Sequence, residues 1–255
     1  RKPDIIGFSC YIWNFGIVQE LLLELPKLLP CTDIWLGGPE VSFDGVELLK
    51  KYPGVTGIMS GEGEQTFKEL LVYYKGTIGN MSDIKGLILR NGATVPREPL
   101  DMNELPFLYD DLSAFDNKII YYESSRGCPF RCSYCLSAID RNVRIRNFST
   151  VRQELKFFLE HRVPQVKFID RTFNCNHEHA INVWKYIMEN DNGVTNFHFE
   201  IAADIMTEEE IALLRQMRPG LAQLEIGVQS TYEPTLREIN RFVNTAHIAK
   251  VVREL

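Results

Sequence analysis

The first third of the chain alternates short apolar runs with amphipathic segments. The apolar runs end in glycine and small polar residues, and they span residues 4–11, 32–38 and 56–61. The segments with apolar positions at helical spacing span residues 15–29, 45–52 and 64–75. Strand followed by helix, repeated in this way, predicts a parallel sheet with helices on its faces.

The pattern changes near residue 84. Residues 84–90 and 93–97 predict an antiparallel hairpin, because Asn91-Gly92 between them supplies the positive φ angles of a tight turn. The next segment, residues 96–117, contains three prolines and several acids with little periodicity, so we expect it to be a linker.

Strand–helix alternation resumes at Lys118. The expected strands span residues 119–124, 165–170, 196–202 and 222–228. The expected helices span residues 151–161, 179–189, 208–217 and 246–255. Thr207 followed by Glu210 predicts a capping box at the start of the third helix. Four such units correspond to about half of a (β/α)8 barrel.

The expected fold is therefore α/β with two domains. A Rossmann-like parallel sheet with its hairpin occupies residues 1–95, the linker residues 96–117, and a partial (β/α) barrel residues 118–255. The chain begins just before a buried-type strand and stops inside a helix, so we expect both domains to be incomplete at their outer ends.

Composition narrows the class of protein. Of the 255 residues, 45% are hydrophobic and 24% charged, which is ordinary for a globular protein. No run of about 18 uncharged apolar residues occurs, so no membrane span is expected. The net charge of −6 argues against a broad nucleic-acid surface. Residues 1–4 are not a signal peptide, so we expect a cytoplasmic protein whose cysteines serve metal or redox chemistry.

Three cysteines fall close together, in the stretch S-S-R-G-C-P-F-R-C-S-Y-C-L-S-A of residues 124–138. Cys128, Cys132 and Cys135 can hold three irons of a [4Fe–4S] cluster, which leaves the fourth iron open to a small molecule. The alternatives are no metal, or a zinc or four-ligand site that takes its fourth ligand from Cys175, His177 or His179. Only one C-x2-C unit is present, so the open-iron cluster is favoured.

The stretch C-P-F-R-C-S-Y-C, with Tyr134 before the last cysteine, resembles the radical S-adenosylmethionine (SAM) superfamily. S-R-G-C-P-F, with G-G-P-E at 37–40 and G-E-G-E at 61–64, resembles members that carry an N-terminal cobalamin-binding-type domain. The resemblance implies that SAM chelates the open iron and is cleaved by one electron to a 5′-deoxyadenosyl radical, which abstracts hydrogen from a small-molecule substrate. It also implies oxygen sensitivity and a reductant such as flavodoxin or ferredoxin.

Two of the barrel strands predict a polar inner face. Period-two alternation separates Phe197 and Phe199 from His198 and Glu200, and it likewise aligns Glu225, Gly227 and Gln229 on one face. Such polar groups need partners, and either a ligand or a buried polar network would provide them.

The resemblance also implies which residues hold SAM. G-V-Q-S and I-N-R resemble the branch that includes coproporphyrinogen dehydrogenases, which implies that Gln229 contacts the ribose and Arg241 the methionyl carboxylate. Glu200 matches an acid of the family that contacts SAM, and we expect Tyr134 to be a cofactor-binding residue as well. The second strand lacks the family's Gly-Gly pair, so Asp170, or backbone carbonyls near it, is expected to take the SAM amino group.

The first domain also offers a ligand site. Ser9, Gly37-Gly38 and Gly61 end successive strands, where doubly wound sheets bind ligands, and the resemblance implies cobalamin. Residues 1–160 contain no histidine, so cobalamin would bind without histidine ligation, or the domain no longer binds it. The expected reaction is methylation or rearrangement at an unactivated carbon. The alternatives are a methylthiotransferase-like modifier of RNA and a non-catalytic, zinc-stabilised binding protein.

Overall fold

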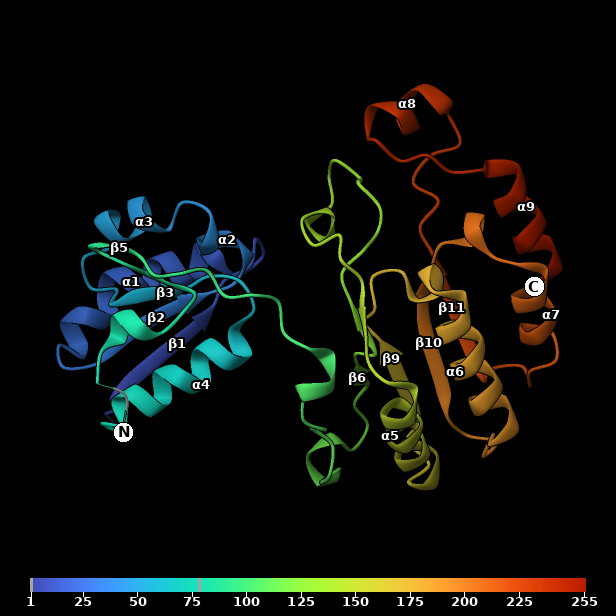
Figure 1. The fold of residues 1–255 in the computed structure, drawn as a ribbon, viewed down its shortest axis with the longest axis horizontal. Coiled ribbons are helices and arrows are strands. Elements are labelled where there is room, and N and C mark those ends of the chain that lie inside the picture. The colour runs from blue at the N-terminus through green and yellow to red at the C-terminus, as the bar shows by residue number, and fades with distance from the viewer. Residues whose placement is uncertain (1, 78) are drawn as a thin grey trace. The chain divides into compact units, whose positions relative to one another are not determined.

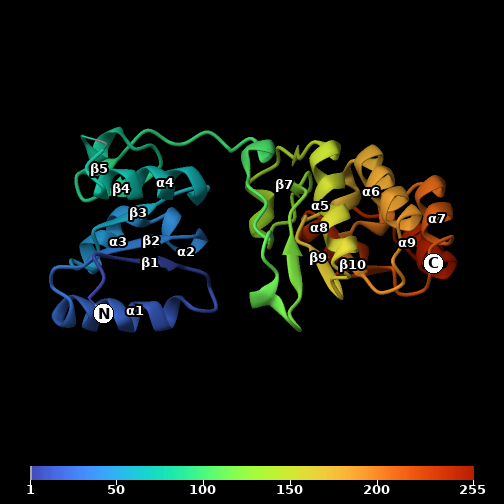
Figure 2. The same cartoon turned by 90° about the horizontal axis from the view of Figure 1, so that it is seen from below.

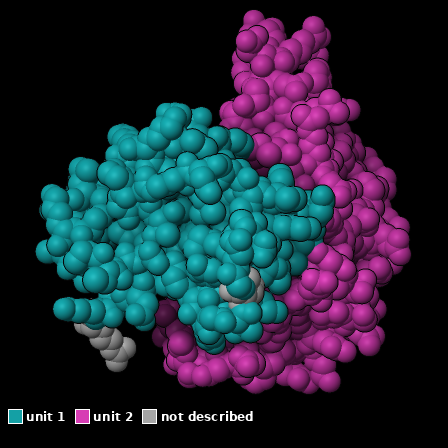
Figure 3. All heavy atoms as spheres, turned by 60° about the vertical axis from the view of Figure 1, so that its left-hand side comes forward, with its two compact units in different colours: residues 1–100 teal, residues 101–255 magenta. Residues whose placement is uncertain are grey.

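The structure, a computed structural model, describes residues 2–77 and 79–255. It divides into two compact units between Leu100 and Asp101, coloured separately in Figure 3. The described residues of the first unit form two hydrophobic cores and those of the second unit form one, and each unit is described here by itself.

The first unit is a mixed sheet covered by helices. Its elements are β1 (Ile5–Ser9), α1 (Phe15–Leu28), β2 (Asp33–Gly37), α2 (Pro39–Ser42), α3 (Gly45–Lys51), β3 (Gly57–Met59), α4 (Gly63–Tyr74), the 3₁₀ helix η1 (Met81–Asp83), β4 (Leu87–Leu89) and β5 (Gly92–Ala93). The strand order is β1-β2-β3-β4-β5, with the first three strands parallel and the last two antiparallel (Figure 1).

Alternation along β2 explains why both faces of this sheet are covered. Ile34 and Leu36 pack in one core with residues of α1 and α3, whereas Trp35 packs in a second core with Leu70 of α4. The hairpin is present, but of its two turn residues only Gly92 has a positive φ, of 129°.

The second unit is a half-barrel. Its elements are η2 (Met102–Glu104), η3 (Ser113–Phe115), β6 (Ile120–Tyr122), β7 (Ser125–Arg126), η4 (Leu136–Ala138), β8 (Arg144–Ile145), α5 (Phe148–Glu160), β9 (Gln165–Phe168), η5 (Phe173–Cys175), α6 (His177–Glu189), β10 (Asn196–Ile201), η6 (Ala203–Ile205), α7 (Glu208–Leu214), β11 (Ala222–Ile226), α8 (Glu233–Glu238) and α9 (Thr245–Glu254). Four strands pair in parallel in the order β11-β10-β9-β6.

Helices α5, α6 and α7 follow one another along the outer face of this sheet (Figures 1 and 2). Phe197 and Phe199 of β10 are fully buried against them, in the same core as Phe158 and Trp184. The opposite, inner face carries His198 and Glu200, so the polar face predicted from alternation is present. Thr207 and Glu210 form the predicted capping box at the start of α7.

The expected linker is corrected by the structure. The boundary between the units lies at residues 100 and 101, and the segment after it belongs to the second unit. Met102 is buried, Phe107 packs edge-on against Phe157, and Tyr109 packs edge-on against Phe158 of the core. Aromatic side chains therefore attach residues 101–117 to the half-barrel, although prolines and acids hide any periodicity in this segment.

Candidate functional site

The three clustered cysteines lie on one loop between β7 and β8, which we call the cysteine loop (residues 127–143). The antiparallel pairing of Ser125 with Ile145 closes its stem. Gly127 has a φ of +100°, and a Cβ at this position would lie 2.7 Å from the Asn142 carbonyl oxygen. Glycine is therefore required where the chain enters the loop, because the backbone of the returning strand is too close for a side chain.

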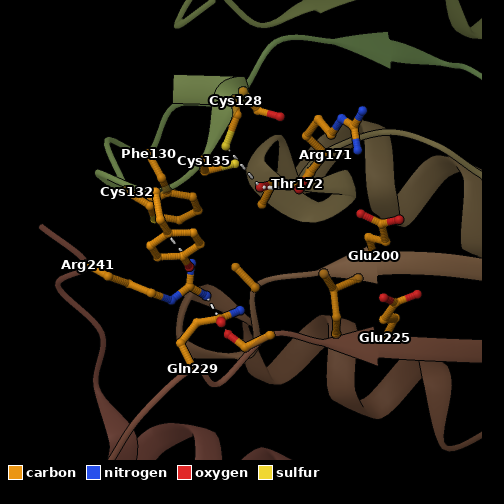
Figure 4. A pocket seen from close by; sticks show the side chains of 15 residues that line it. Cys128, Phe130, Cys132, Cys135, Arg171, Thr172, Glu200, Glu225, Gln229 and Arg241 are labelled. Carbon is orange, nitrogen blue, oxygen red and sulfur yellow. Dashed lines mark hydrogen bonds between the residues drawn. The ribbon is translucent and has the colours of Figure 1, made fainter. Parts of the chain in front are cut away.

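The cysteine loop forms one wall of a cavity of about 230 Å³ at the carboxyl ends of β9, β10 and β11 (Figure 4). In barrel folds this end of the sheet carries the reactive groups. The cavity is lined by Cys128, Phe130, Cys132, Tyr134, Cys135, Ser137, Arg171, Thr172, Glu200, Ile201, Ala202, Glu225, Gly227, Gln229 and Arg241. The structure thus brings all three cysteines together with Tyr134, Glu200, Gln229 and Arg241, as expected for one site.

Two of the thiols have polar contacts at the wall. The Cys128 Sγ lies 3.4 Å from the Thr172 Oγ1, and the Arg241 Nη1 donates to the Cys132 Sγ at 3.4 Å. Arg241 also donates from Nη2 to the Gly227 carbonyl oxygen at 2.6 Å, which ties its guanidinium to the end of β11. Burial, and then the neighbouring Cys132, raise the pKa of the Tyr134 phenol.

These residues fit a thiolate-held cluster with a bound carboxylate ligand. Three soft sulfur donors, two of them on buried cysteines, face one cavity. The Nε of Arg241 is buried and has no hydrogen-bond partner among the described residues, so its guanidinium retains donor capacity for a carboxylate. Among residues 2–77 and 79–255, no group of three His, Cys, Asp or Glu side chains is arranged to hold a single metal ion.

The far wall of the cavity carries charge. Glu200 and Glu225, neighbours across β10 and β11, both line it, and Lys167 of β9 lies 3.5 Å from Glu200 and 3.0 Å from Glu225. The hydrogen bond from Lys167 lowers the pKa of Glu225, and that same bond raises the pKa of Lys167. Figure 4 shows these carboxylates across the cavity from the cysteines. The charged side chains on the inner face are therefore already paired with one another, and a ligand could form further hydrogen bonds with them.

Gln229 is held in an unusual backbone conformation. Its φ is +65°, in the left-handed region that costs a non-glycine residue free energy. Gly227 makes this geometry possible, since a Cβ there would lie 2.8 Å from the Gln229 Nε2. In this conformation the Gln229 side chain lies beside Gly227 at the end of β11 and lines the cavity.

Asp170 does not face the cavity, which corrects its expected position. Its side chain is fully buried and accepts hydrogen bonds from the Ser124 backbone N at 2.8 Å, the Ser124 Oγ at 2.6 Å and the Ser125 Oγ at 2.7 Å. Through these three hydrogen bonds the carboxylate braces the chain just before the cysteine loop. The other part of that expectation, backbone carbonyls beside Asp170, stays a prediction.

Cys175, His177 and His179, each of which could have been the fourth ligand of a zinc site, also lie outside the cavity. His177 pairs with Glu210 at 3.0 Å, and His179 lies with its Nε2 2.8 Å from the Ser124 Oγ. Cys175 is half-buried, and burial raises the pKa of its thiol to about 11. None of the three lines the cavity.

Sequence reasoning missed several lining residues, above all Arg171 and Thr172. They follow β9 in a loop without periodicity, and the contact of Thr172 with Cys128 spans 44 positions. The one available signal was their place directly after a barrel strand, where functional side chains gather.

The first unit has a second cavity, of about 420 Å³, at the carboxyl ends of its parallel strands. Ser9, Gly37, Gly38 and Gly61 line it, as expected from their positions at strand ends. Gly38 has a φ of +101°, and a Cβ there would lie 2.5 Å from the Cys10 carbonyl oxygen, so the floor is bare backbone. Tyr11, Met59 and Phe67 add apolar surface, as is usual for a ligand-binding cavity.

Comparison with protein families agrees with this arrangement of half-barrel and cysteine loop. A family model of the radical SAM superfamily matches residues 122–255, more than half of the chain. The chain therefore belongs to the radical SAM superfamily, and a [4Fe–4S] cluster and SAM are its implied cofactors. Residues 1–71 match the family model of the B12 binding domain, so the chain is a radical SAM protein with a cobalamin-binding-type domain.

The curated relatives include methyltransferases, anaerobic magnesium-protoporphyrin IX monomethyl ester cyclases and a putative methylthiotransferase. The 2-(S-pantetheinyl)-carbapenam-3-carboxylate methyltransferase of Streptantibioticus cattleyicolor is 26% identical over 191 residues, which are 67% of this chain and 28% of that protein. The uncharacterized methyltransferase PH0819 of Pyrococcus horikoshii is 31% identical over 196 residues, 71% of this chain and 42% of that protein. The chain thus spans less than half the length of these two relatives.

Solved structures agree on the fold. The cobalamin-dependent SAM radical enzyme OxsB with aqua-cobalamin bound matches with a TM-score of 0.79 at 20% identity, over 99% of this chain and 39% of that one. The radical SAM methyltransferase TsrM of Kitasatospora setae, with tryptophan and a SAM analogue bound, matches with a TM-score of 0.74 at 19% identity, over 100% of this chain and 55% of that one. In the described part of the chain, no helix is both long and apolar enough to span a membrane.

Proposed function

We propose that this chain is the core of a cobalamin-dependent radical SAM methyltransferase. The observation that carries the proposal is the single cavity that brings Cys128, Cys132 and Cys135 together with Gln229 and Arg241. The match of the first unit to the B12 binding domain and the methyltransferase relatives support methyl transfer over the alternatives of zinc binding or RNA methylthiolation. When bound, the cluster, SAM and cobalamin supply reductive SAM cleavage and a carrier for the methyl group.

The chain's own residues have distinct tasks in this proposal. Cys128, Cys132 and Cys135 hold the cluster through their thiolates. The guanidinium of Arg241 binds the SAM carboxylate, since one of its buried N–H groups has no partner among the described residues. Gln229 orients the ribose from its strained position at the end of β11, and Glu200 completes the polar wall.

Cobalamin would occupy the cavity of the first unit against the backbone of Gly37, Gly38 and Gly61. No histidine precedes His161 in the sequence, so the protein part of this unit offers no imidazole to cobalt. The substrate is a small molecule with an unactivated carbon, and the electron comes from a low-potential donor such as flavodoxin or ferredoxin. A cytoplasmic location stays a prediction.

The ligand assignment is tested by iron binding. Each of the variants Cys128→Ala, Cys132→Ala and Cys135→Ala should lose the brown chromophore after anaerobic reconstitution with iron and sulfide. Cys175→Ala is the matched control, because this thiol is nearby but does not line the cavity, and it should keep iron and sulfide near four each per chain. Equal loss in the Cys175 variant, or one zinc per chain in place of iron, would contradict the proposal.

The cobalamin part is tested separately. The chain is incubated with hydroxocobalamin, free cofactor is removed, and the absorption spectrum is recorded. We expect retained cobalamin with the spectrum of the base-off form without protein nitrogen on cobalt. Gly38→Ala should abolish retention, because its Cβ would displace the Cys10 backbone, whereas Gly193→Ala in the second unit meets no atom within 4 Å and should not. A folded wild-type chain that retains no cobalamin would remove the methyltransferase reading.

A further inference from the structure

A short turn after α8 forms hydrogen bonds with the cysteine loop, although more than a hundred residues separate the two segments in the sequence. The Ile239 carbonyl oxygen accepts from the Ser133 backbone N at 2.9 Å, and the Asn240 Nδ2 donates to the Arg131 carbonyl oxygen at 2.9 Å. The third contact is the hydrogen bond from Arg241 to the Cys132 Sγ. Three consecutive residues thus bind three consecutive residues of the loop, on both sides of a cysteine.

The turn has its own firm support. The backbone N atoms of Ile239, Asn240 and Arg241 donate to carbonyl oxygens of α8 or its cap, at 3.0, 3.1 and 2.8 Å. Arg241 is anchored a second time through its bond to Gly227 at the end of β11. Asn240 has a φ of +54°, in the left-handed region that asparagine tolerates better than most residues. The turn is therefore a fixed point that can hold the cysteine loop in place.

The middle of the cysteine loop has little other support in the described residues. Its other backbone hydrogen bonds are local, such as the one that Cys135 N donates to the Cys132 carbonyl oxygen at 3.1 Å. The loop's stem is fixed at its other end, where the Cys128 N donates to the Asp140 carbonyl oxygen at 2.9 Å. Without the turn, Cys132 would sit on a segment that is anchored only near Cys128 and by its own short contacts.

We propose that the turn Ile239–Arg241 is a clamp that holds Cys132 ready for the cluster before metal arrives, with Asn240 as its positioning residue. The inference rests on the proposed cluster site. A loop that must be ordered by metal alone loses binding free energy to that ordering, so an ordered loop binds metal more tightly. Because Arg241 is both part of the clamp and the proposed carboxylate partner, the clamp also sets the SAM-binding arginine at a fixed place beside Cys132.

The first test uses the metal-free chain, so that it does not depend on the cluster. Asn240→Gly keeps the positive φ and removes the amide that binds Arg131. Amide hydrogen exchange of residues 130–136 should become about three- to tenfold faster, since one hydrogen bond is lost. Asn117→Gly is the matched control, because Asn117 has a similar φ of +57° outside the loop, and it should leave this exchange unchanged.

The second test follows metal binding. Asn240→Gly should bind iron several-fold more slowly during reconstitution and yield a broadened, mixed signal in electron paramagnetic resonance (EPR), while the control matches wild type. Asn240→Asp, which keeps the shape but replaces the donor by an acceptor, should repeat both effects if the glycine variant is poorly folded. Unchanged exchange in both variants overturns the clamp. A wild-type chain that takes up no iron contradicts the proposed function, while the exchange comparison still decides the clamp.

Discussion

Replacing Asp170 by asparagine tests the buried network that braces the chain just before the cysteine loop. Burial raises the pKa of Asp170 to about 6, against hydrogen bonds from Ser124 and Ser125 that lower it. The Ser124 Oγ also contacts His179, and burial lowers the pKa of His179 to about 4. An acid and a base with opposite shifts therefore share one serine hydroxyl.

The two shifts change stability in opposite directions over the same pH range. Folded Asp170 keeps a proton that the unfolded chain releases above pH 3.8, so its contribution falls by about 3 kcal/mol as pH rises to about 6. The unfolded chain protonates His179 below pH 6.5 and the folded chain does not, so its contribution is lost, by about 3 kcal/mol, as pH falls to about 4. In the wild type the two contributions nearly cancel.

Asp170→Asn removes the acid and leaves the histidine. The free energy of unfolding of the variant, relative to wild type, should therefore rise by up to about 3 kcal/mol between about pH 4 and pH 6. Urea titrations of the metal-free protein under reducing conditions, at half-unit pH steps, measure this difference. His179→Gln is the matched variant and should show the opposite slope.

A difference between Asp170→Asn and wild type that does not change with pH would refute the reasoning. It would mean that Asp170 is ionised throughout this range and that its three donors outweigh burial. Because the side chain lies outside the cavity, SAM affinity should be nearly the same in the variant as in the wild type.

Two further predictions concern the cavity itself. Arg241→Ala should lower SAM affinity about tenfold or more in calorimetry of the cluster-loaded chain, because a charged hydrogen bond contributes about 1.5–3 kcal/mol. Gln229→Ala should lower the affinity less, because its hydrogen bond is neutral. Equal affinities in both variants and the wild type would show that SAM binds elsewhere. Gly127→Ala should reduce iron uptake sharply, because its Cβ would lie 2.7 Å from the Asn142 carbonyl oxygen, whereas Gly193→Ala has a φ of +74° but open space and should leave iron uptake unchanged. Normal iron content in the Gly127 variant would contradict the role given to that backbone approach.

Periodicity was sufficient to predict the four parallel strands of the half-barrel, its helices α5, α6, α7 and α9, and its inner face, but it did not predict α8 or the short strands β7 and β8. Strand side chains alternate, so the buried Phe197 and Phe199 fix where Glu200 must point, and the cavity wall follows. The cysteine spacing likewise predicted one shared site, since three thiolates within eight positions can reach a common centre. The structure places these residues at one cavity, and their roles toward SAM stay predictions.

What the sequence could not predict depends on contacts between distant segments. Asp170 ends an apparent strand, but β9 stops at Phe168 and the chain then turns, which carries the carboxylate under Ser124. Phe107 lies in a segment without periodicity, so its packing in the barrel core is visible only in three dimensions. The contact of Asn240 with Arg131 joins positions 109 residues apart, and no local pattern encodes it.

The most direct test of the central claim is the EPR signal of the reduced chain with and without SAM. The claim is that Cys128, Cys132 and Cys135 hold a cluster whose open iron faces the SAM site. After anaerobic reconstitution and reduction, the signal of the cluster should shift when SAM is added, and Arg241→Ala should require a higher SAM concentration for the same shift. A cluster signal that does not change at saturating SAM, or the absence of any cluster in correctly folded protein, would contradict this claim.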